Sequence, residues 1–182
     1  MPYRHLIKSA AEARGVDEAW VYGITRQESR FMHYAKSGVG AAGLMQLMPA
    51  TAKWAAGRVG MDDYNKSMIH DLDTNVALGT YYMAYTKDLF SGQETMATAA
   101  YNAGPSRAKK WVATVPLEGA IYIETIPFSE TRGYVQKVMA NAHLYAPRLG
   151  LKTMTLKQRL GTIPSRYAAF EISNYQSETE QV

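Results

Sequence analysis

Apolar residues recur along this chain at the three- and four-residue spacing of an α-helix, and this periodicity constrains the fold more than any other feature. The clearest stripe runs through Trp20, Ile24 and Phe31, which share one face of a helix. Glycine and proline interrupt the periodic segments and mark where helices end. No internal repeat and no alternating strand pattern stands out. The sequence therefore predicts a mainly α protein.

The periodic segments predict a series of helices joined by loops. Their expected positions are about residues 3–14, a helix capped by Asp17, a helix restarting at Pro49, a long central helix capped by Asp73 or Thr74, a helix over 96–103, one that carries Trp111, and one that follows Ser129 and ends at Pro147. Glycines at 38, 40 and 43 predict a loop, and residues 58–73 read as an irregular surface loop.

At 182 residues with 47% hydrophobic content, the chain is long enough to bury a sizeable core. We expect one domain over residues 1–150. Past Gly150 the pattern weakens and the end is polar and acidic, so residues 151–182 read as a C-terminal arm that is partly mobile.

The formal net charge is +4, but the basic residues are dispersed and the longest run is Lys109-Lys110. A nucleic-acid partner needs a basic stripe or patch, so this pattern argues against one and favours a mild attraction to an anionic surface or polymer. Zero cysteines exclude disulfides and cysteine nucleophiles. No apolar run reaches the roughly 20 residues of a spanning helix, and no signal region follows the N-terminus.

The sequence lacks the residue patterns that metal sites, serine hydrolases and nucleotide-binding sites require. The four histidines are scattered without a metal-ligand spacing, and the acidic pairs at 62–63 and 71–73 lack the ligand pattern of a calcium loop. No Gly-x-Ser-x-Gly, phosphate-binding lysine loop or dinucleotide fingerprint is present. We therefore expect neither a metal site nor a cofactor.

One carboxylate stands out by its position. Glu28 closes the apolar stripe just before a glycine-rich stretch. We expect it to be partly dehydrated, and burial would raise its pKa so that it could act as a general acid near neutral pH. A structural glutamate that accepts a salt bridge or caps the following turn remains the alternative.

Glu28 is accompanied downstream by amide, aromatic and glycine-rich segments. These are residues 43–46, 100–104 and 126–132. Such a set suits a sugar polymer, because aromatic rings cover apolar sugar faces while amides and carboxylates hold hydroxyl and acetamido groups. Most of the thirteen tyrosines are nevertheless expected in the core.

These segments resemble the ordered motifs of the soluble lytic transglycosylases, the Slt type. Residues 26–29 (Arg-Gln-Glu-Ser) resemble the catalytic motif, 40–49 the second motif and 100–105 the third. Residues 126–135 (Ile-Pro-Phe-Ser-Glu-Thr-Arg-Gly-Tyr-Val) resemble the stretch that separates this subfamily from its relatives. The resemblance extends over about residues 3–145, and Ser106 departs from the usual glycine at a turn.

The resemblance implies a lysozyme-like α-helical fold and cleavage of the β-1,4 bond between N-acetylmuramic acid and N-acetylglucosamine in peptidoglycan. Glu28 would protonate the glycosidic oxygen and then take the proton of the muramoyl C6 hydroxyl, which attacks C1 and forms a 1,6-anhydro ring. An ordinary glycosidase needs two carboxylates, whereas this scheme needs one, with the acetamido group of the substrate stabilising C1.

The resemblance also implies roles for further residues. Tyr101 would orient Glu28, and Asn102 would support the cleft. The positions that resemble glycan-lining residues are Ser37, Gln46, Met48, Tyr82 and Glu130. Arg132 and Tyr134 read as structural, the arginine held beside carboxylates and the tyrosine on a packed helix.

Two alternatives stay open: a lysozyme-type hydrolase that admits water in place of the C6 hydroxyl, and a catalytically silent glycan-binding module. The implied location is the periplasm, with an export signal outside this chain. The implied partners are glycan strands and other cell-wall enzymes. Full-length Slt proteins carry an α-helical superhelix before the catalytic domain, so we expect this chain to be an excised domain.

Overall fold

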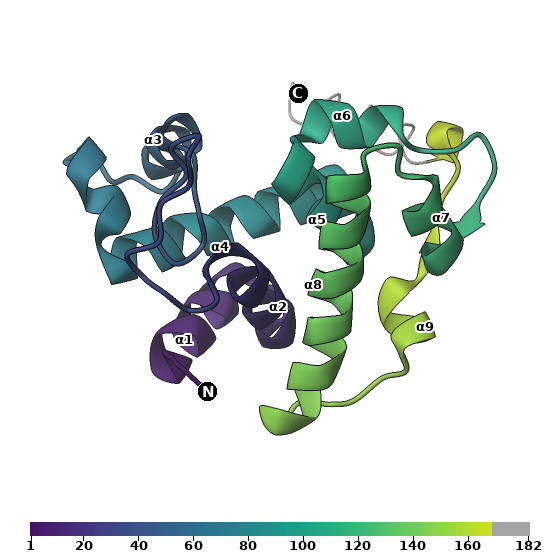
Figure 1. Ribbon diagram of the computed structural model, residues 1–182, viewed down its shortest axis with the longest axis horizontal. Helices are drawn as coiled ribbons and strands as arrows, with labels where there is room; N and C mark the ends of the chain where they lie inside the picture. Colours follow the sequence, from purple (N-terminus) through teal and green to yellow (C-terminus); the bar gives the residue numbers. More distant parts are fainter. Residues whose placement is uncertain (169–182) are drawn as a thin grey trace, which may run out of the picture. The chain divides into compact units, whose positions relative to one another are not determined.

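The computed structural model describes residues 1–168, and the described chain is mainly helical (Figure 1), which confirms the predicted class. Its elements, in chain order, are α1 (Arg4–Arg14), α2 (Glu18–Ser29), α3 (Pro49–Arg58), the 3-10 helix η1 (Lys66–His70), α4 (Leu72–Leu89), α5 (Glu94–Ala103), α6 (Pro105–Lys110), β1 (Leu117–Glu118), α7 (Gly119–Thr125), α8 (Ser129–Arg148), α9 (Leu156–Leu160) and β2 (Thr162–Ile163).

The chain divides into two compact units. Unit 1 contains Met1–Ala84 and Ala140–Thr153, and unit 2 contains Tyr85–Met139 and the described residues from Met154 onward. The division falls inside α4 and inside α8, so each of these long helices contributes to both units. The predicted division into residues 1–150 and 151–182 stays a prediction.

In unit 1, α1 and α2 form a helical hairpin with well-formed ends. Gly15 ends α1 with a φ of 62°, a left-handed conformation that glycine adopts without strain. Asp17 caps α2, because its Oδ1 accepts a hydrogen bond from the backbone N–H of Trp20 at 2.8 Å. Trp20 and Ile24 are fully buried, so this part of the predicted stripe faces the core. Phe31, predicted on the same helix face, lies beyond the end of α2 at Ser29.

Two details of unit 1 differ from the sequence-based prediction. The long helix α4 begins at Leu72, and its cap is Asp71, whose Oδ2 accepts from the N–H of Thr74 at 3.0 Å. Asp73 and Thr74 lie inside the first turn, so neither is the cap. The segment predicted as an irregular loop contains η1, which Asn65 caps. Short helices of this type carry too little periodicity to be seen in the sequence.

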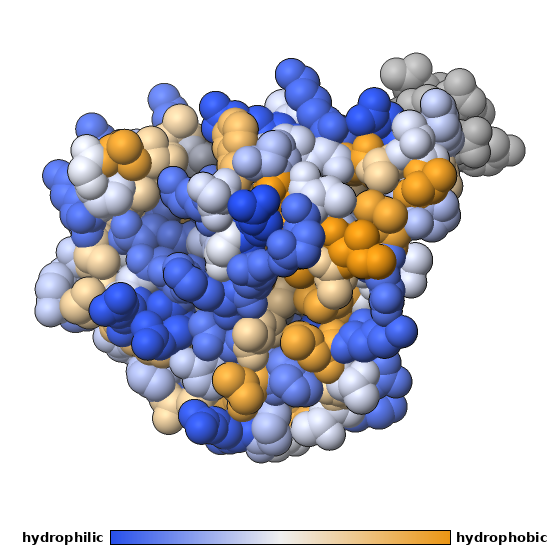
Figure 2. Space-filling view, turned by 45° about the vertical axis from the view of Figure 1, so that its right-hand side comes forward, coloured by the Kyte–Doolittle hydropathy of each residue, from blue (hydrophilic) through white to orange (hydrophobic). Residues whose placement is uncertain are grey.

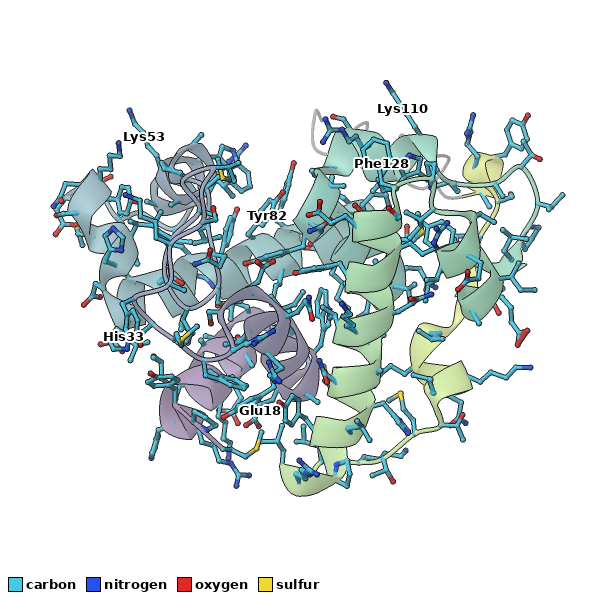
Figure 3. All side chains as sticks on the ribbon, viewed as in Figure 1. Glu18, His33, Lys53, Tyr82, Lys110 and Phe128 are labelled. Atoms are coloured by element: carbon cyan, nitrogen blue, oxygen red, sulfur yellow. The ribbon has the colours of Figure 1, made fainter. Side chains whose placement is uncertain are left out.

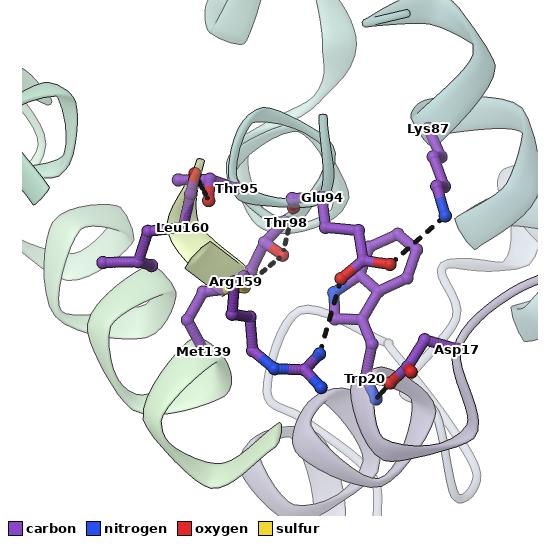
Figure 4. A network of polar contacts seen from close by, with 9 residues as sticks. All are labelled: Asp17, Trp20, Lys87, Glu94, Thr95, Thr98, Met139, Arg159 and Leu160. Carbon is purple, nitrogen blue, oxygen red and sulfur yellow. Dashed lines mark hydrogen bonds and ion pairs between the residues drawn. The ribbon is translucent and has the colours of Figure 1, made fainter. Parts of the chain in front are cut away.

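In unit 2 the described C-terminal segment packs against α5 and α7. The strands β1 and β2 pair antiparallel, with Leu117 opposite Ile163, and the Thr95 hydroxyl donates to the carbonyl of Leu160 at 3.0 Å. Arg159 reaches Glu94 at 3.5 Å, and Glu94 also pairs with Lys87 at 3.2 Å (Figure 4). These contacts fasten residues 156–163 to the start of α5.

The sequence pattern does not predict the strand pair or α7, because two-residue strands and a seven-residue helix give no clear period. Trp111 stands just after α6 as its C-cap, so the helix predicted to carry it ends one residue earlier. The sequence predicts that the end of the C-terminal arm is mobile. Residues 169–182, which form that end, lie outside the described residues, so this stays a prediction.

Apolar side chains gather on the face of unit 2 that α7 and α9 form (Figure 2). Ile121 is 53% exposed and Leu156 is 39% exposed there. A shallow groove of about 170 Å³ between α7, α8 and α9 has Ile123 and Leu160 in its wall. Within residues 1–168, no helix combines the length and apolar character that crossing a membrane requires.

Candidate functional site

Glu28 is the penultimate residue of α2 and is half-buried, as its place at the end of the stripe predicts. The next residue, Ser29, is buried and holds the helix end together. Its hydroxyl donates to the carbonyl of Thr25 at 3.3 Å and accepts from the N–H of Phe31 at 3.1 Å. Glu28 therefore extends from a rigid helix end.

The chain reverses direction immediately after this helix end. Arg30 and Phe31 adopt left-handed backbone conformations, with φ of 52° and 67°. Non-glycine residues adopt this region rarely, and strained backbone of this kind concentrates at functional sites. The ring of Phe31 packs at 5.9 Å from Tyr22 and at 6.4 Å from Tyr145. The aromatic contacts offset the cost of the strained turn and fix the start of the following loop.

The loop between α2 and α3 carries three predicted site residues. The hydroxyl of Ser37 accepts from the N–H of Ala41 at 2.9 Å. Gln46, in a left-handed conformation with φ of 50°, donates its amide N–H groups to the carbonyls of Ala35 and Gly43, both at 2.8 Å. Met48 is the N-cap residue of α3 and is 42% exposed.

Asn75 holds this loop in place, a role that the sequence pattern does not predict. It is 1% exposed. Its Oδ1 accepts from the N–H of Met45 at 2.8 Å, and its Nδ2 donates to the carbonyls of Ala42 and Ile69 at 3.0 and 2.8 Å. A polar residue within an apolar helix pattern is the only sequence signal it gives. Through the bonds of Asn75 to Met45 and Ala42, α4 fixes the loop that carries Gln46.

Tyr82 lies on α4 and is half-buried (Figure 3). Its ring packs edge-on against Trp54 of α3, with ring centroids 6.3 Å apart. Trp54 also contacts Tyr81 at 5.8 Å. The three rings form an aromatic cluster in unit 1, and aromatic rings suit the apolar faces of sugars.

The remaining predicted residues belong to unit 2. Tyr101 and Asn102 lie in the last turn of α5, half-buried, and Glu130 is exposed in the first turn of α8. Asn102 Oδ1 accepts a hydrogen bond from the buried hydroxyl of Thr131 at 2.8 Å. This bond ties the third motif to the fourth and brings Glu130 to the end of α5.

An aromatic cluster that the sequence pattern does not predict forms around Phe128, two residues before Glu130 in the chain. Phe128, which is 47% exposed, packs edge-on against Trp111 at 5.2 Å, and the Arg107 guanidinium lies over its ring at 5.5 Å (Figure 3). Arg132, expected beside carboxylates, instead donates to the backbone carbonyl of Ile126 at 3.2 Å. Tyr134 is buried, which fits a structural role.

The structure thus gathers the predicted residues into two groups. Unit 1 contains Glu28, Ser37, Gln46, Met48 and Tyr82, and unit 2 contains Tyr101, Asn102 and Glu130. That Tyr101 orients Glu28 stays a prediction, as do the binding roles of the other residues.

A second carboxylate on α2 competes with Glu28 on electrostatic grounds. Glu18 is 8% exposed, and burial raises its pKa, against the opposing effect of Arg4, whose Nε lies 4.0 Å away. Perturbed carboxylates are candidates for catalysis. However, Glu18 lies in the first turn of α2 against α1, at the opposite end of the helix from the loop of Ser37 and Gln46 (Figure 3). We assign it a structural role.

Metal ligands do not cluster in the part of the chain that the structure describes. No group of three or more histidine, aspartate or glutamate side chains there is arranged to hold a metal ion. The groups that unit 1 offers at the predicted site are the carboxylate of Glu28, the hydroxyl of Ser37 and the amide of Gln46.

The chain is similar to known protein families and to individual proteins. The transglycosylase SLT domain model matches residues 5–122, and the soluble lytic transglycosylase helical domain model matches residues 125–153. The soluble lytic murein transglycosylase of Salmonella typhimurium is 36% identical over 155 residues, covering 84% of this chain and 24% of that protein.

Solved structures of similar proteins agree with these sequence matches. The lytic transglycosylase Slt of Pseudomonas aeruginosa, described as an inactive mutant with glutamate replaced by glutamine, is 41% identical with a TM-score of 0.82, covering 86% of this chain and 25% of that one. The 70-kDa soluble lytic transglycosylase of Escherichia coli is 34% identical with a TM-score of 0.77, covering 87% and 25%. The chain spans about a quarter of the length of these relatives. With the SLT model matching more than half of its residues, this chain belongs to the soluble lytic transglycosylase family.

Proposed function

We propose that this chain is the catalytic part of a peptidoglycan lytic transglycosylase. Its substrate is the β-1,4 bond between N-acetylmuramic acid and N-acetylglucosamine, and its product carries a 1,6-anhydro ring. The observation that carries the proposal is the half-buried Glu28 on a rigid helix end, in a chain whose relatives are named for this activity. The inactive glutamate-to-glutamine mutant among the solved relatives supports an essential glutamate.

In the proposed reaction, protonated Glu28 donates its proton to the glycosidic oxygen, and the bond from that oxygen to C1 of the muramoyl residue breaks. The carboxylate that remains takes the proton of the C6 hydroxyl of the same sugar, and the oxygen attacks C1. Glu28 is then protonated again, so no water is consumed and no second carboxylate is needed. The acetamido group of the substrate stabilises the positive charge at C1.

The other residues have supporting roles in this proposal. Tyr101 orients Glu28, and Asn102, held by Thr131, supports the cleft. Ser37, Gln46, Met48, Tyr82 and Glu130 line the glycan subsites, and the rigid hydrogen bonding of Gln46 supports a preformed site. The lysozyme-like fold, the periplasmic location, the link to a superhelical domain and association with other cell-wall enzymes belong to the same proposal.

The test compares two glutamate-to-glutamine variants of the same helix. Glu28→Gln is expected to keep the fold and to lower the release of muropeptides from intact peptidoglycan by about a thousandfold, because the general acid is lost. Glu18→Gln is the matched control. Glu18 lies in the first turn of α2, at the opposite end of the helix from Glu28, so activity should persist.

Mass spectrometry of the products decides between the open alternatives. Anhydro ends, which lack one water, would establish the transglycosylase, whereas reducing ends would make the protein a hydrolase. Binding without release would indicate a silent module. Full turnover by the Glu28→Gln variant would contradict the mechanism altogether.

A further inference from the structure

The C-terminal segment of unit 2 reaches the end of α6 through Arg166. The backbone N–H of Arg166 donates to the carbonyl of Ala113 at 2.7 Å. Its guanidinium donates to the carbonyl of Lys110 at 3.1 Å and to that of Val112 at 3.2 Å from Nε and 3.0 Å from the terminal nitrogen. Lys110 is the last residue of α6, and the other two acceptors follow shortly after it. Arg166 therefore fastens the end of this helix.

The acceptors at the end of α6 are groups that a short helix cannot satisfy by itself. α6 has six residues, and the last four carbonyls of a helix have no donor within it. A helix of this length is also unstable in isolation. A cationic guanidinium supplies donors that form strong, charge-assisted hydrogen bonds, and its charge is favourable at a helix C-terminus. The position of the helix end thus depends on Arg166.

Trp111 lies between the two carbonyls that the guanidinium binds. The carbonyl of Lys110 belongs to the peptide bond that precedes Trp111, and the carbonyl of Val112 lies one residue beyond it. Holding both carbonyls restricts the backbone dihedrals of Trp111, and the backbone sets the direction of its half-buried indole ring. Arg166 therefore fixes where this ring lies.

The indole of Trp111 in turn supports Phe128. The two rings pack edge-on, with centroids 5.2 Å apart, and the guanidinium of Arg107 lies over the Phe128 ring at 5.5 Å. Phe128 is 47% exposed, so burial alone does not hold its ring. Both contacts come from α6 or its C-cap. The place of Phe128 consequently follows the place of the end of α6.

Phe128 begins the helical turn that contains Glu130. Its carbonyl accepts from the backbone N–H of Arg132 at 2.8 Å, and Glu130 lies in this first turn of α8. Within the same turn, the hydroxyl of Thr131 donates to Asn102 of α5 at 2.8 Å. The turn is thus held at two points, by α5 through Thr131 and by α6 through Phe128.

We propose that Arg166 is a positioning residue for Glu130 and acts through Trp111 and Phe128 without contacting the substrate. This inference rests on the proposed function, which gives Glu130 its contact with the glycan strand. Because Glu130 binds the strand in that proposal and Glu28 alone transfers protons, loss of Arg166 weakens substrate binding and leaves the chemical step unchanged.

The first test separates KM from kcat on soluble peptidoglycan strands. Arg166→Ala is expected to raise KM by about fivefold or more and to leave kcat within about twofold of the wild type. Arg166→Lys keeps the charge but lacks the planar fork that binds two carbonyls, so its KM should lie between those of the wild type and Arg166→Ala. An unchanged KM in Arg166→Ala, or a loss confined to kcat, would overturn the inference.

Lys157→Ala is the matched control for this test. It removes the same charge from the same segment, where the lysine is 79% exposed and pairs with Glu118. Its KM and kcat should remain those of the wild type. An equal rise of KM in Lys157→Ala and Arg166→Ala would show an effect of net charge and would also overturn the inference. Circular dichroism and melting temperature establish that the variants fold.

A double-mutant cycle tests the route through Phe128. Phe128→Ala alone should raise KM, and adding Arg166→Ala to it should raise KM by less than about twofold more, because the ring through which Arg166 acts is then absent. Arg166→Lys replaces Arg166→Ala in the cycle if the alanine variant melts below the assay temperature. Effects that simply multiply would show that Arg166 acts independently of Phe128 and would contradict the proposed route.

A binding measurement distinguishes failure of this inference from failure of the proposed function. The three tryptophans are replaced by fluorotryptophan, and the fluorine resonance of Trp111 is identified by its loss in Trp111→Phe. Arg166→Ala should shift this resonance, leave those of Trp20 and Trp54 in place, and raise the Kd of chitohexaose, a β-1,4-linked N-acetylglucosamine polymer, by about fivefold or more.

The outcomes of the binding measurement and of product analysis are read together. An unmoved Trp111 resonance, an unchanged Kd, or no binding of chitohexaose by the wild type would reject the role of Arg166, and anhydro products from the same wild type would keep the transglycosylase. A shifted resonance with a raised Kd, but no products from peptidoglycan, would keep the role of Arg166 in glycan binding and reject the proposed activity.

Discussion

At the scale of single residues, the candidate site depends on close contacts that only one residue type permits. Gly43 has a φ of 82° and lies against Asn75, the residue that holds the loop. A Cβ at position 43 would come within 2.5 Å of Asn75 Cγ and 2.9 Å of the Ile69 carbonyl oxygen. Both the backbone conformation and the space therefore require glycine.

Gly43→Ala is expected to destabilise the protein by about 2 kcal/mol or more, because it combines a strained φ with overlap against Asn75 and backbone. Gly57→Ala is the matched control. Gly57 lies exposed in α3 with nothing within 4 Å of an added Cβ, and the change should stabilise by about 0.5–1 kcal/mol. Urea denaturation measures the free energy of unfolding of both variants. Equal effects of the two substitutions would contradict this account.

At the scale of elements, the C-terminal segment supports the helix that carries Tyr101 and Asn102. Arg159 of α9 pairs with Glu94 in the first turn of α5, and its side chain is 2% exposed. Removing one partner of a buried pair leaves the other charge poorly compensated. Lys157 of the same segment pairs with Glu118 of β1 in solvent, where ion pairs contribute little.

Arg159→Ala is accordingly expected to lower the free energy of unfolding by about 3 kcal/mol, whereas Lys157→Ala should leave the melting temperature nearly unchanged. Denaturation of the two variants side by side provides the measurement. Hydrogen exchange adds a second reading, since the amides of α5 should lose protection in the first variant only. Unaltered stability on loss of Arg159 would show that the segment does not hold α5.

At the scale of the whole molecule, buried tyrosines make the fold sensitive to alkali. Burial raises the pKa of Tyr22 and of Tyr122 to about 12, from an ordinary value near 10. Well below pH 10 both residues are neutral in the folded and unfolded chain, so they add no pH dependence there. Between about pH 10 and 12 the unfolded chain releases these protons and the folded chain retains them, so stability falls as pH rises.

The expected loss is on the order of 2 kcal/mol per tyrosine by pH 12, measured as urea denaturation at a series of pH values. Tyr122→Phe should remove about half of this dependence. At pH 7 the same variant should be as stable as the wild type or more so, because the Tyr122 hydroxyl has no hydrogen-bond partner in the described part of the chain. A Tyr122→Phe variant that loses as much stability at alkaline pH as the wild type would contradict the role given to Tyr122.

Much of the molecule follows from local pattern. The bounds of α1, the cap at Asp17 and the restart at Pro49 depend on interactions among residues a few positions apart, so the sequence alone predicts them. The order of the motifs along the chain is enough to predict the family, and the family match confirms that prediction. Short elements such as η1, α7 and the β1–β2 pair escape prediction because tertiary contacts, not periodicity, stabilise them.

The sequence by itself determined the mainly α class, the family and the placement of Glu28 at the end of a buried stripe, since these depend on residue order and helical spacing. Only the tertiary structure decided that Asn75 fastens the loop of Gln46, that Arg159 meets Glu94, and that Lys53 and Lys66 line one hollow. Contacts between residues tens of positions apart depend on how the helices pack. Packing is set by the shape and burial of many side chains together, and no single segment encodes it.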